Sequence, residues 1–331
     1  MSPLDLLVLF LSVHTLASPV VKRDAPDFAF DGDAPFTVSA SDLAASLTCP
    51  NGNPTQDSPP VLLVHGTATT GEESWGDGYI PALLANGYTG CYITIPNRSM
   101  GDMQLNAEYV AYNLHYLSHL SGNLPTAVIT HSQGGPNTQW ALQFWPSTRN
   151  ITRAFVALSP DFAGIDLLGS PSLLNDICEG GLCQASMWQQ SAGSRYYDAL
   201  HGHGFMELVP TTTVWTQFDG VVVPAQNNAQ LPGATVLSVQ SLCPLRPTNH
   251  VTMTISSAAY SLALDALNNN GVASLSRVKK NALSICLRIT AKGMNVSVAK
   301  DLQSLLENLV KGFLLGTAKL KAEPAIAAYA Q

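Results

Sequence analysis

Charged residues are scarce in this sequence, and it has no long apolar run. Asp, Glu, Lys and Arg make up 12% of its 331 residues, while 46% are hydrophobic, and the formal net charge is −7 at pH 7. These values argue against a disordered chain and against binding to nucleic acid or an anionic membrane surface. The apolar stretch Leu6–Leu11 is too short to cross a bilayer. Repeats and low-complexity linkers are also lacking, which favours one domain.

The amino end has the features of a secretory leader. The short apolar stretch is followed by Leu16-Ala17-Ser18, which ends in small residues, and Lys22-Arg23 forms a dibasic site. We therefore predict a signal peptide over residues 1–18, a propeptide over 19–23 and a single domain over 24–331 of a secreted, extracellular protein. No transmembrane segment is expected.

Six cysteines in a secreted chain predict three disulfides, for which fifteen pairings exist. Cys178 and Cys183 enclose a short glycine-rich loop, and we predict that they pair locally. Asn97, Asn150 and Asn295 each begin an N-glycosylation motif, which has meaning because the chain is predicted to be secreted.

Thr130-His131-Ser132-Gln133-Gly134 is the most informative motif of the sequence. It follows the apolar run Ala127–Ile129 and precedes a predicted helix at Pro136–Leu142. The pattern G-x-S-x-G places a nucleophilic serine on a sharp turn between strand and helix. Threonine replaces the first glycine here, but the strand and helix around the motif indicate such a nucleophile elbow at Ser132.

Strands alternate with helices along the chain, which predicts an α/β fold with a mostly parallel sheet covered by helices on both faces. The predicted strands are Val61–Val64, Cys91–Ile95, Ala127–Ile129, Arg153–Leu158 and Thr212–Gln217. The other predicted helices cover about 78–86, 104–120 and 194–201. An irregular insertion covers about 161–190. Leucines at helical spacing predict an amphipathic helix over about 298–321, which either packs on the domain or lines a substrate entrance.

Ser132 needs a base to accept its proton and an acid to orient that base. In α/β-hydrolases the acid and then the histidine follow the serine along the chain. Asp219 comes directly after a predicted strand, and His250 lies on a later loop. An Asp-Gly turn and a lone surface histidine are the alternative interpretations, but the order of the three residues favours a triad.

An oxyanion formed during ester cleavage needs preorganised hydrogen-bond donors. The residue after the nucleophile, Gln133, supplies a backbone N–H, and Thr67 in the loop after an earlier strand supplies another. Other histidines, the pair His115 and His119 and the pair His201 and His203, lack further ligands and are interpreted as packing or loop residues. We predict no metal and no cofactor.

Taken together, these motifs resemble the family of Candida antarctica lipase B, secreted fungal α/β-hydrolases that act on carboxylic esters. The likeness extends from about residue 25 to 286. It includes Leu47–Cys49, Leu62–Gly71, the elbow, Ser159–Asp161, Trp188–Gln190 and the Asp219 segment. The resemblance implies the triad and oxyanion hole named above, together with disulfides Cys49–Cys91 and Cys243–Cys286.

The resemblance also implies pocket residues: Asp161 and Gln190 on the acyl side and Val221 as an apolar wall. His131 stands where the family has a tryptophan on the alcohol side, so we expect that side to be wider and more polar. Cys178 and Cys183 fall in the segment that matches a mobile helix, which they could brace as a lid. The family's carboxyl-terminal disulfide is missing, with Ala322 at one of its positions.

The leading hypothesis is a secreted serine lipase or carboxylesterase that hydrolyses or transesterifies esters such as acylglycerols through an acyl-enzyme. It would act as a monomer on a lipid or small ester, with a lipid–water interface as a further partner. The alternatives are a cutinase-like polyester hydrolase, an acyltransferase, and a catalytically silent lipid-binding hydrolase fold.

Overall fold

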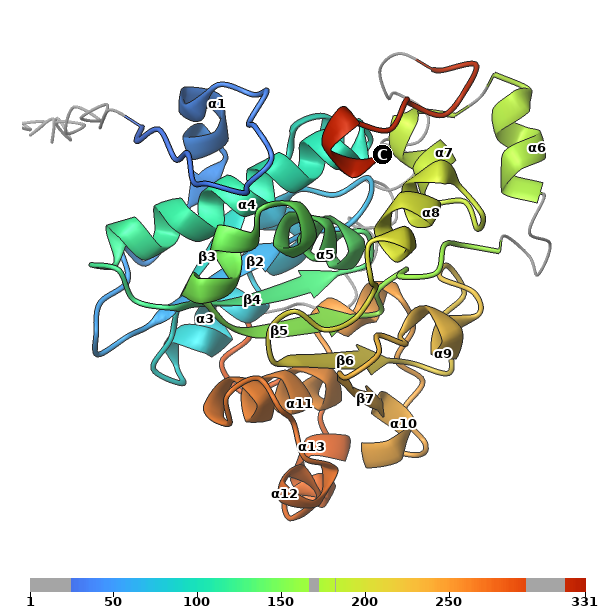
Figure 1. The fold of residues 1–331 in the computed structure, drawn as a ribbon. Helices are drawn as coiled ribbons and strands as arrows, with labels where there is room; N and C mark the ends of the chain where they lie inside the picture. Colours follow the sequence, from blue (N-terminus) through green and yellow to red (C-terminus); the bar gives the residue numbers. More distant parts are fainter. Residues whose placement is uncertain (1–24, 167–172, 182, 296–318) are drawn as a thin grey trace, which may run out of the picture.

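A central sheet organises the molecule (Figure 1). The computed structural model describes residues 25–166, 173–181, 183–295 and 319–331, and within them seven strands form one sheet in the order β1-β3-β2-β4-β5-β6-β7. The strands are β1 (Leu47–Thr48), β2 (Pro60–Val64), β3 (Thr89–Ile93), β4 (Thr126–His131), β5 (Thr152–Leu158), β6 (Thr211–Trp215) and β7 (Thr235–Ser238). β1 runs antiparallel to β3, and all other neighbouring strands are parallel. The predicted mostly parallel sheet is confirmed.

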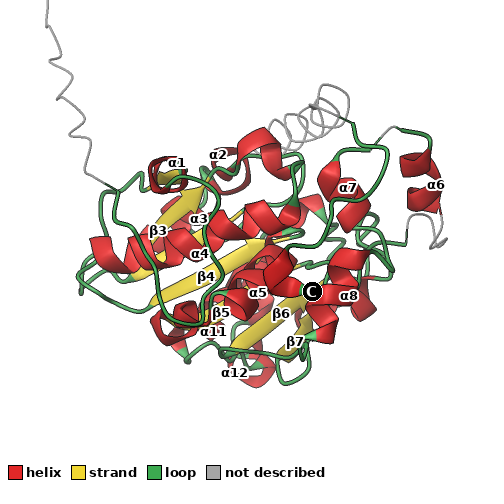
Figure 2. Ribbon diagram, turned by 45° about the horizontal axis from the view of Figure 1, so that its top comes forward, coloured by secondary structure: helices red, strands yellow, loops and turns green. Residues whose placement is uncertain are grey.

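Helices cover both faces of this sheet (Figures 1 and 2). The longer ones are α4 (Met103–Leu120), α5 (Gly134–Phe144), α8 (Arg195–Gly202) and α11 (Ser257–Asn268). The shorter ones are α1 (Ala40–Ala45), α2 (Gly71–Trp75), α3 (Tyr79–Leu84), α6 (Leu173–Glu179), α7 (Ala185–Gln189), α9 (Ala225–Asn228), α10 (Val239–Leu242), α12 (Leu275–Lys279) and α13 (Ala282–Cys286).

Side chains of the central strands alternate between two buried cores. In β2, Leu62 and Val64 join the core beneath α4 and α5, while Val61 and Leu63 join the core beneath α3 and α11. The same alternation holds in β4, where Val128 faces the first core and Ile129 the second. Because both faces are buried, these strands read as unbroken apolar runs, and the period of two is hidden in the sequence.

The insertion after β5 contains α6 and α7. In both views α6 lies at the edge of the molecule, away from the sheet (Figures 1 and 2). Cys178 and Cys183 form a disulfide and pack with Trp188 in a small separate cluster. The carboxyl-terminal residues return to this region, because the Leu320 N–H donates to the Cys183 carbonyl at 2.8 Å. Most of the predicted 298–321 helix lies outside the described residues.

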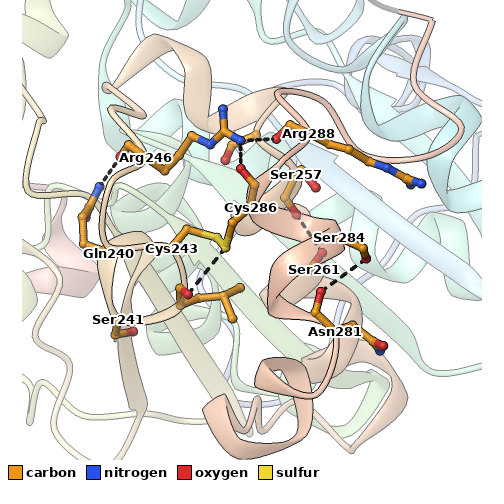
Figure 3. The surroundings of a disulfide bond; sticks show 12 residues. Gln240, Ser241, Cys243, Arg246, Ser257, Ser261, Asn281, Ser284, Cys286 and Arg288 are labelled. Carbon is orange, nitrogen blue, oxygen red and sulfur yellow. Dashed lines mark hydrogen bonds between the residues drawn. A yellow bond between two sulfur atoms is a disulfide. The ribbon is translucent and has the colours of Figure 1, made fainter.

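Two further disulfides, Cys49–Cys91 and Cys243–Cys286, are the same two pairings that the family resemblance implies. The second ties the segment after α10 to the end of α13, as Figure 3 shows. Arg246 reinforces the same junction by donating hydrogen bonds to the carbonyl oxygens of Cys286 and Arg288 (Figure 3).

Candidate active site

Ser132 lies on the sharp turn between β4 and α5. Its φ is +53°, in the left-handed region that residues with a side chain rarely adopt. The strained turn is held by a hydrogen bond from the Ser132 N–H to Leu158 O at 3.0 Å and by another from the Gly135 N–H to Ser132 O at 2.8 Å. The backbone geometry is thus that of a nucleophile elbow at the end of a central strand.

Small residues around the elbow permit this turn. A Cβ on Gly134 would lie 2.7 Å from Val64 O, and a Cβ on Gly66 would lie 2.8 Å from the Cβ of Ser132. Thr130 takes the place of the usual first glycine, and its side chain is fully buried. The residues that must be glycine here are therefore Gly134, after the serine, and Gly66, in the loop that faces it. Position 130 can be threonine.

His250 and Asp219 form a buried pair. His250 Nδ1 donates to Asp219 Oδ2 at 2.8 Å, with side chains 7% and 1% exposed. Asp219 Oδ1 accepts the N–H groups of Val221 at 3.0 Å and Val222 at 2.9 Å. Burial by itself raises the pKa of Asp219. The hydrogen bond from His250, the charge of His250 and the two backbone N–H groups together outweigh burial, so the pKa of Asp219 is lowered. An ionised carboxylate only accepts, so Nδ1 carries the proton and Nε2 is left as a base.

His131 connects this pair to the elbow. Its Nε2 lies 2.9 Å from His250 O, and the two rings are 4.7 Å apart between centroids. A carbonyl oxygen only accepts, so His131 carries its proton on Nε2. Burial, followed by the charge of His250, lowers the pKa of His131 to about 3. His131, the neighbour of Ser132 in the elbow, thus brings His250 to the end of β4, and His131 is neutral near pH 7.

The loop after β2 lies beside the elbow and carries Thr67. The Thr67 hydroxyl donates to Gln190 Oε1 at 2.8 Å and accepts from Gln133 Nε2 at 3.0 Å. Gln133 also occupies the N-cap position of α5, where the first backbone N–H groups have no partner within the helix, although its side chain makes no capping hydrogen bond. The two residues predicted to supply the oxyanion donors therefore contact each other through their side chains.

His65 anchors the same loop from its amino end. Its Nε2 accepts the N–H of Ile95 at 3.0 Å.

The remaining predicted pocket residues lie in two different settings. Asp161 is fully buried; Tyr197 donates to its Oδ2 at 3.1 Å, while Oδ1 has no hydrogen-bond partner among the described residues. Burial raises the pKa of Asp161 to about 7. Gln190 is buried against Thr67, as described, but Val221 is 46% exposed. A role of Val221 as an apolar wall stays a prediction.

Several functional contacts were not predicted from the sequence. Gln133 Oε1 accepts from Asn106 and Asn137, at 3.2 and 3.1 Å. Arg98 contacts the loop of Thr67, and Tyr197 contacts Asp161. Asn137 lies one helical turn after Gln133, whereas the other pairs come from segments that only the folded chain brings together, so no spacing rule connects them.

The other predicted sites are exposed or structural. Asn97, Asn150 and Asn295 are exposed, and their glycosylation stays a prediction. His115 is buried on α4 with its Nε2 2.8 Å from Ser147 Oγ, as in helix packing. Within the part of the chain that the structure describes, no group of three or more His, Cys, Asp or Glu residues could hold a metal ion.

The sheet, the elbow and the buried His–Asp pair define a serine hydrolase of the α/β-hydrolase class. The chain is 34% identical over 266 residues to lipase B of Pseudozyma antarctica, covering 78% of this chain and 75% of the relative. It therefore belongs to the lipase B family and is a carboxylic ester hydrolase.

Solved structures agree with this assignment. Aspergillus fumigatus lipase B superimposes with a TM-score of 0.82 at 31% identity, covering 91% of this chain and 74% of that one. The mature Bacillus licheniformis lipase BlEst2 matches with a TM-score of 0.52 at 15% identity, covering 68% of this chain and 98% of that one, and shares the fold. A search with models of protein families gave no match. Among the described residues, no helix has both the length and the apolar content needed to cross a membrane.

Proposed function

We propose that this protein is a secreted lipase or carboxylesterase that hydrolyses esters such as acylglycerols with Ser132, His250 and Asp219 as its triad. The observation that carries the proposal is the His250–Asp219 hydrogen bond of 2.8 Å, held beside a serine in a strained elbow. Asp219 is fixed by two backbone N–H groups on its other oxygen, so it orients the imidazole. This arrangement leaves His250 Nε2 as the base for the serine hydroxyl.

The reaction begins when Ser132 Oγ attacks the ester carbonyl and His250 Nε2 takes its proton. The tetrahedral oxyanion accepts hydrogen bonds from the backbone N–H groups of Thr67 and Gln133. The positive amino end of α5 adds to this stabilisation. The Thr67 hydroxyl, which here donates to Gln190, becomes a third donor when it turns toward the oxyanion.

Collapse of the intermediate breaks the bond to the alcohol, which leaves with the proton from His250. The acyl group then remains on Ser132. A water molecule, activated by the same imidazole, attacks the acyl-enzyme and releases the acid, so the triad returns to its starting state. An alcohol in place of water gives transesterification.

The substrate groups are assigned to the two sides of the elbow. Asp161 and Gln190 belong to the acyl side, and His131 to the alcohol side. Secretion is supported by the three disulfides, which form in oxidising compartments. The proposed domain boundaries are a signal peptide over 1–18, a propeptide over 19–23 and one catalytic domain over 24–331, acting as a monomer.

The test is the hydrolysis of p-nitrophenyl esters from acetate to palmitate by the parent protein and by Ser132→Ala. Ser276→Ala, at an exposed position on α12, is the matched serine control. We expect activity in the parent and the control and background rates in Ser132→Ala, with the chain-length profile separating an esterase from a lipase. Full activity of Ser132→Ala, or an inactive parent, would overturn the proposal.

A further inference from the structure

A strained turn lies next to the oxyanion loop. Asn97, Arg98 and Ser99 are three consecutive residues with positive φ, at 51°, 58° and 57°. Ala68, which follows Thr67 in the oxyanion loop, also has a positive φ of 61°. Such backbone persists only where surrounding contacts hold it, and it gathers at functional sites. The two strained segments are in direct contact.

Arg98 holds both backbone polar groups of Ala68. The Ala68 N–H donates to Arg98 O at 2.8 Å, and Arg98 Nε donates to Ala68 O at 2.8 Å. The far end of the guanidinium, Nη2, lies 2.5 Å from Glu73 Oε2. The same carboxylate oxygen accepts the N–H of Thr70, the residue that caps α2. The oxyanion loop is thus fixed through Arg98 at Ala68 and through Glu73 at Thr70.

The next residue of the turn contacts the second oxyanion donor. Ser99 O accepts from Gln133 Nε2 at 3.1 Å and from Asn106 Nδ2 at 3.2 Å. Gln133 Nε2 in turn donates to the Thr67 hydroxyl. One turn of three residues therefore contacts both halves of the proposed oxyanion hole, although its own side chains do not reach the reacting atoms in the proposed mechanism.

We propose that Arg98 is a positioning residue that sets the distance between the two oxyanion donors. The inference rests on the proposed function. An oxyanion hole works only when its donors lie about 3 Å from the position of the oxyanion, so a shift of the loop that carries Thr67 weakens transition-state binding. Substrate binding in the ground state depends on this distance far less, and the effect falls on kcat.

The alternative is an ordinary surface ion pair. The side chains of Arg98 and Glu73 are 29% and 25% exposed, and pairs at that exposure contribute little to stability. A surface pair predicts no change in kcat when it is removed. The hydrogen bond from Arg98 Nε to the Ala68 carbonyl distinguishes the Arg98 side chain from such a pair, since the bond to the Arg98 carbonyl is kept in any substitution.

The experiment compares a p-nitrophenyl ester with its thionoester in the parent protein and in Arg98→Ala. Sulfur is a weak hydrogen-bond acceptor, so the thionoester gains less from the oxyanion hole. We expect kcat for the oxygen ester to fall about tenfold or more, with KM changing less than about twofold. We also expect the ratio of kcat/KM for the oxygen ester to kcat/KM for the thionoester to fall by about fivefold. Equal losses on both substrates, or none, would overturn the inference.

Two variants keep the result interpretable. Arg98→Lys retains a positive charge near Glu73 but has no Nε–H for the Ala68 carbonyl, so we expect the same fall in the ratio even if Arg98→Ala does not fold. An unchanged ratio in Arg98→Lys contradicts the inference. Arg277→Ala is the matched control, since Arg277 also bonds a carboxylate, Asp265 at 2.8 Å, and a backbone carbonyl, but on α12. A similar fall in this control also contradicts it.

Ser132→Ala separates this inference from the function on which it rests. Activity in Ser132→Ala would refute the proposed function itself. Loss of activity in Ser132→Ala, together with an unchanged ratio in both Arg98 variants, would refute only the role of Arg98.

Discussion

Replacing Asp219 by asparagine changes one atom in the buried pair and reverses its hydrogen bonding. Asp219 Oδ1 accepts two backbone N–H groups, from Val221 and Val222, so the amide oxygen of asparagine must occupy that place. The amide NH₂ then faces His250 Nδ1, where Asp219 Oδ2 now lies at 2.8 Å. Because NH₂ only donates, His250 Nδ1 must become an acceptor, and its proton moves to Nε2.

The wrong tautomer removes the base that Ser132 needs. In serine proteases the same exchange lowers kcat by about 10⁴-fold, which corresponds to about 5 kcal/mol of transition-state stabilisation. We expect a loss of this size in Asp219→Asn with KM nearly unchanged. The melting temperature should change little, because both backbone hydrogen bonds to the residue are retained.

The assay is steady-state hydrolysis of p-nitrophenyl butyrate, with a melting curve for each protein. Asp219→Ala is the comparison, since it also leaves the N–H groups of Val221 and Val222 without their acceptor and should lower the melting temperature further. A loss of less than about tenfold in kcat for Asp219→Asn would refute the tautomer argument, because loss of a properly oriented base costs far more.

Three further predictions follow from the packing and the charges. Gly66→Ala places a Cβ 2.8 Å from the Cβ of Ser132, so the elbow or the loop must shift, and kcat/KM should fall about 10²-fold in ester hydrolysis. Burial raises the pKa of Asp161 from 3.8 to about 7, so the free energy of unfolding should fall as the pH rises between these values and then level off. Asp161→Asn should remove that fall in denaturant titrations at several pH values. Removing the Cys49–Cys91 disulfide, whose sequence separation is 42, by a double alanine variant should lower the free energy of unfolding by about 4 kcal/mol.

Each of these predictions has a matched control. Gly202→Ala, where no atom lies within 4 Å of the new Cβ, should keep full activity. Asp57→Asn, at an exposed position, should leave the pH dependence of stability as it is in the parent. The Cys178–Cys183 disulfide spans only 5 residues and should contribute about 2 kcal/mol. Equal effects in a variant and its control would contradict the corresponding prediction.

The sheet and the elbow could be predicted because their signals are local. Short apolar runs mark β2, β4 and β5, and the serine motif directly follows β4. The edge strand β7, Thr235–Ser238, was not predicted, since it has four residues, of which three are only half-buried. Its pairing with β6 depends on the sheet that is already formed. The lipase B family and the ester hydrolase activity were predicted from matched motifs and are confirmed.

The supporting contacts of the site could not be predicted in this way. Arg98 and Ala68 are 30 residues apart, and Gln133 and Asn106 are 27 apart, with no periodicity to connect them. Polar pairs of this kind form because the folded chain brings their residues close together, whatever their distance in the sequence. The sequence identifies the residues that would perform the chemistry, while the residues that hold them in place become visible only in the folded chain.

The burial of both sheet faces constrains how this chain can change in length during evolution. Inserting one residue in β4 would exchange Val128 and Ile129 between the two cores and would displace Ser132 along the strand. The part of the insertion around α6 has no such restriction, because α6 lies at the edge of the molecule, away from the sheet. Insertions and deletions can therefore reshape the surroundings of the ester here while the position of the nucleophile stays the same.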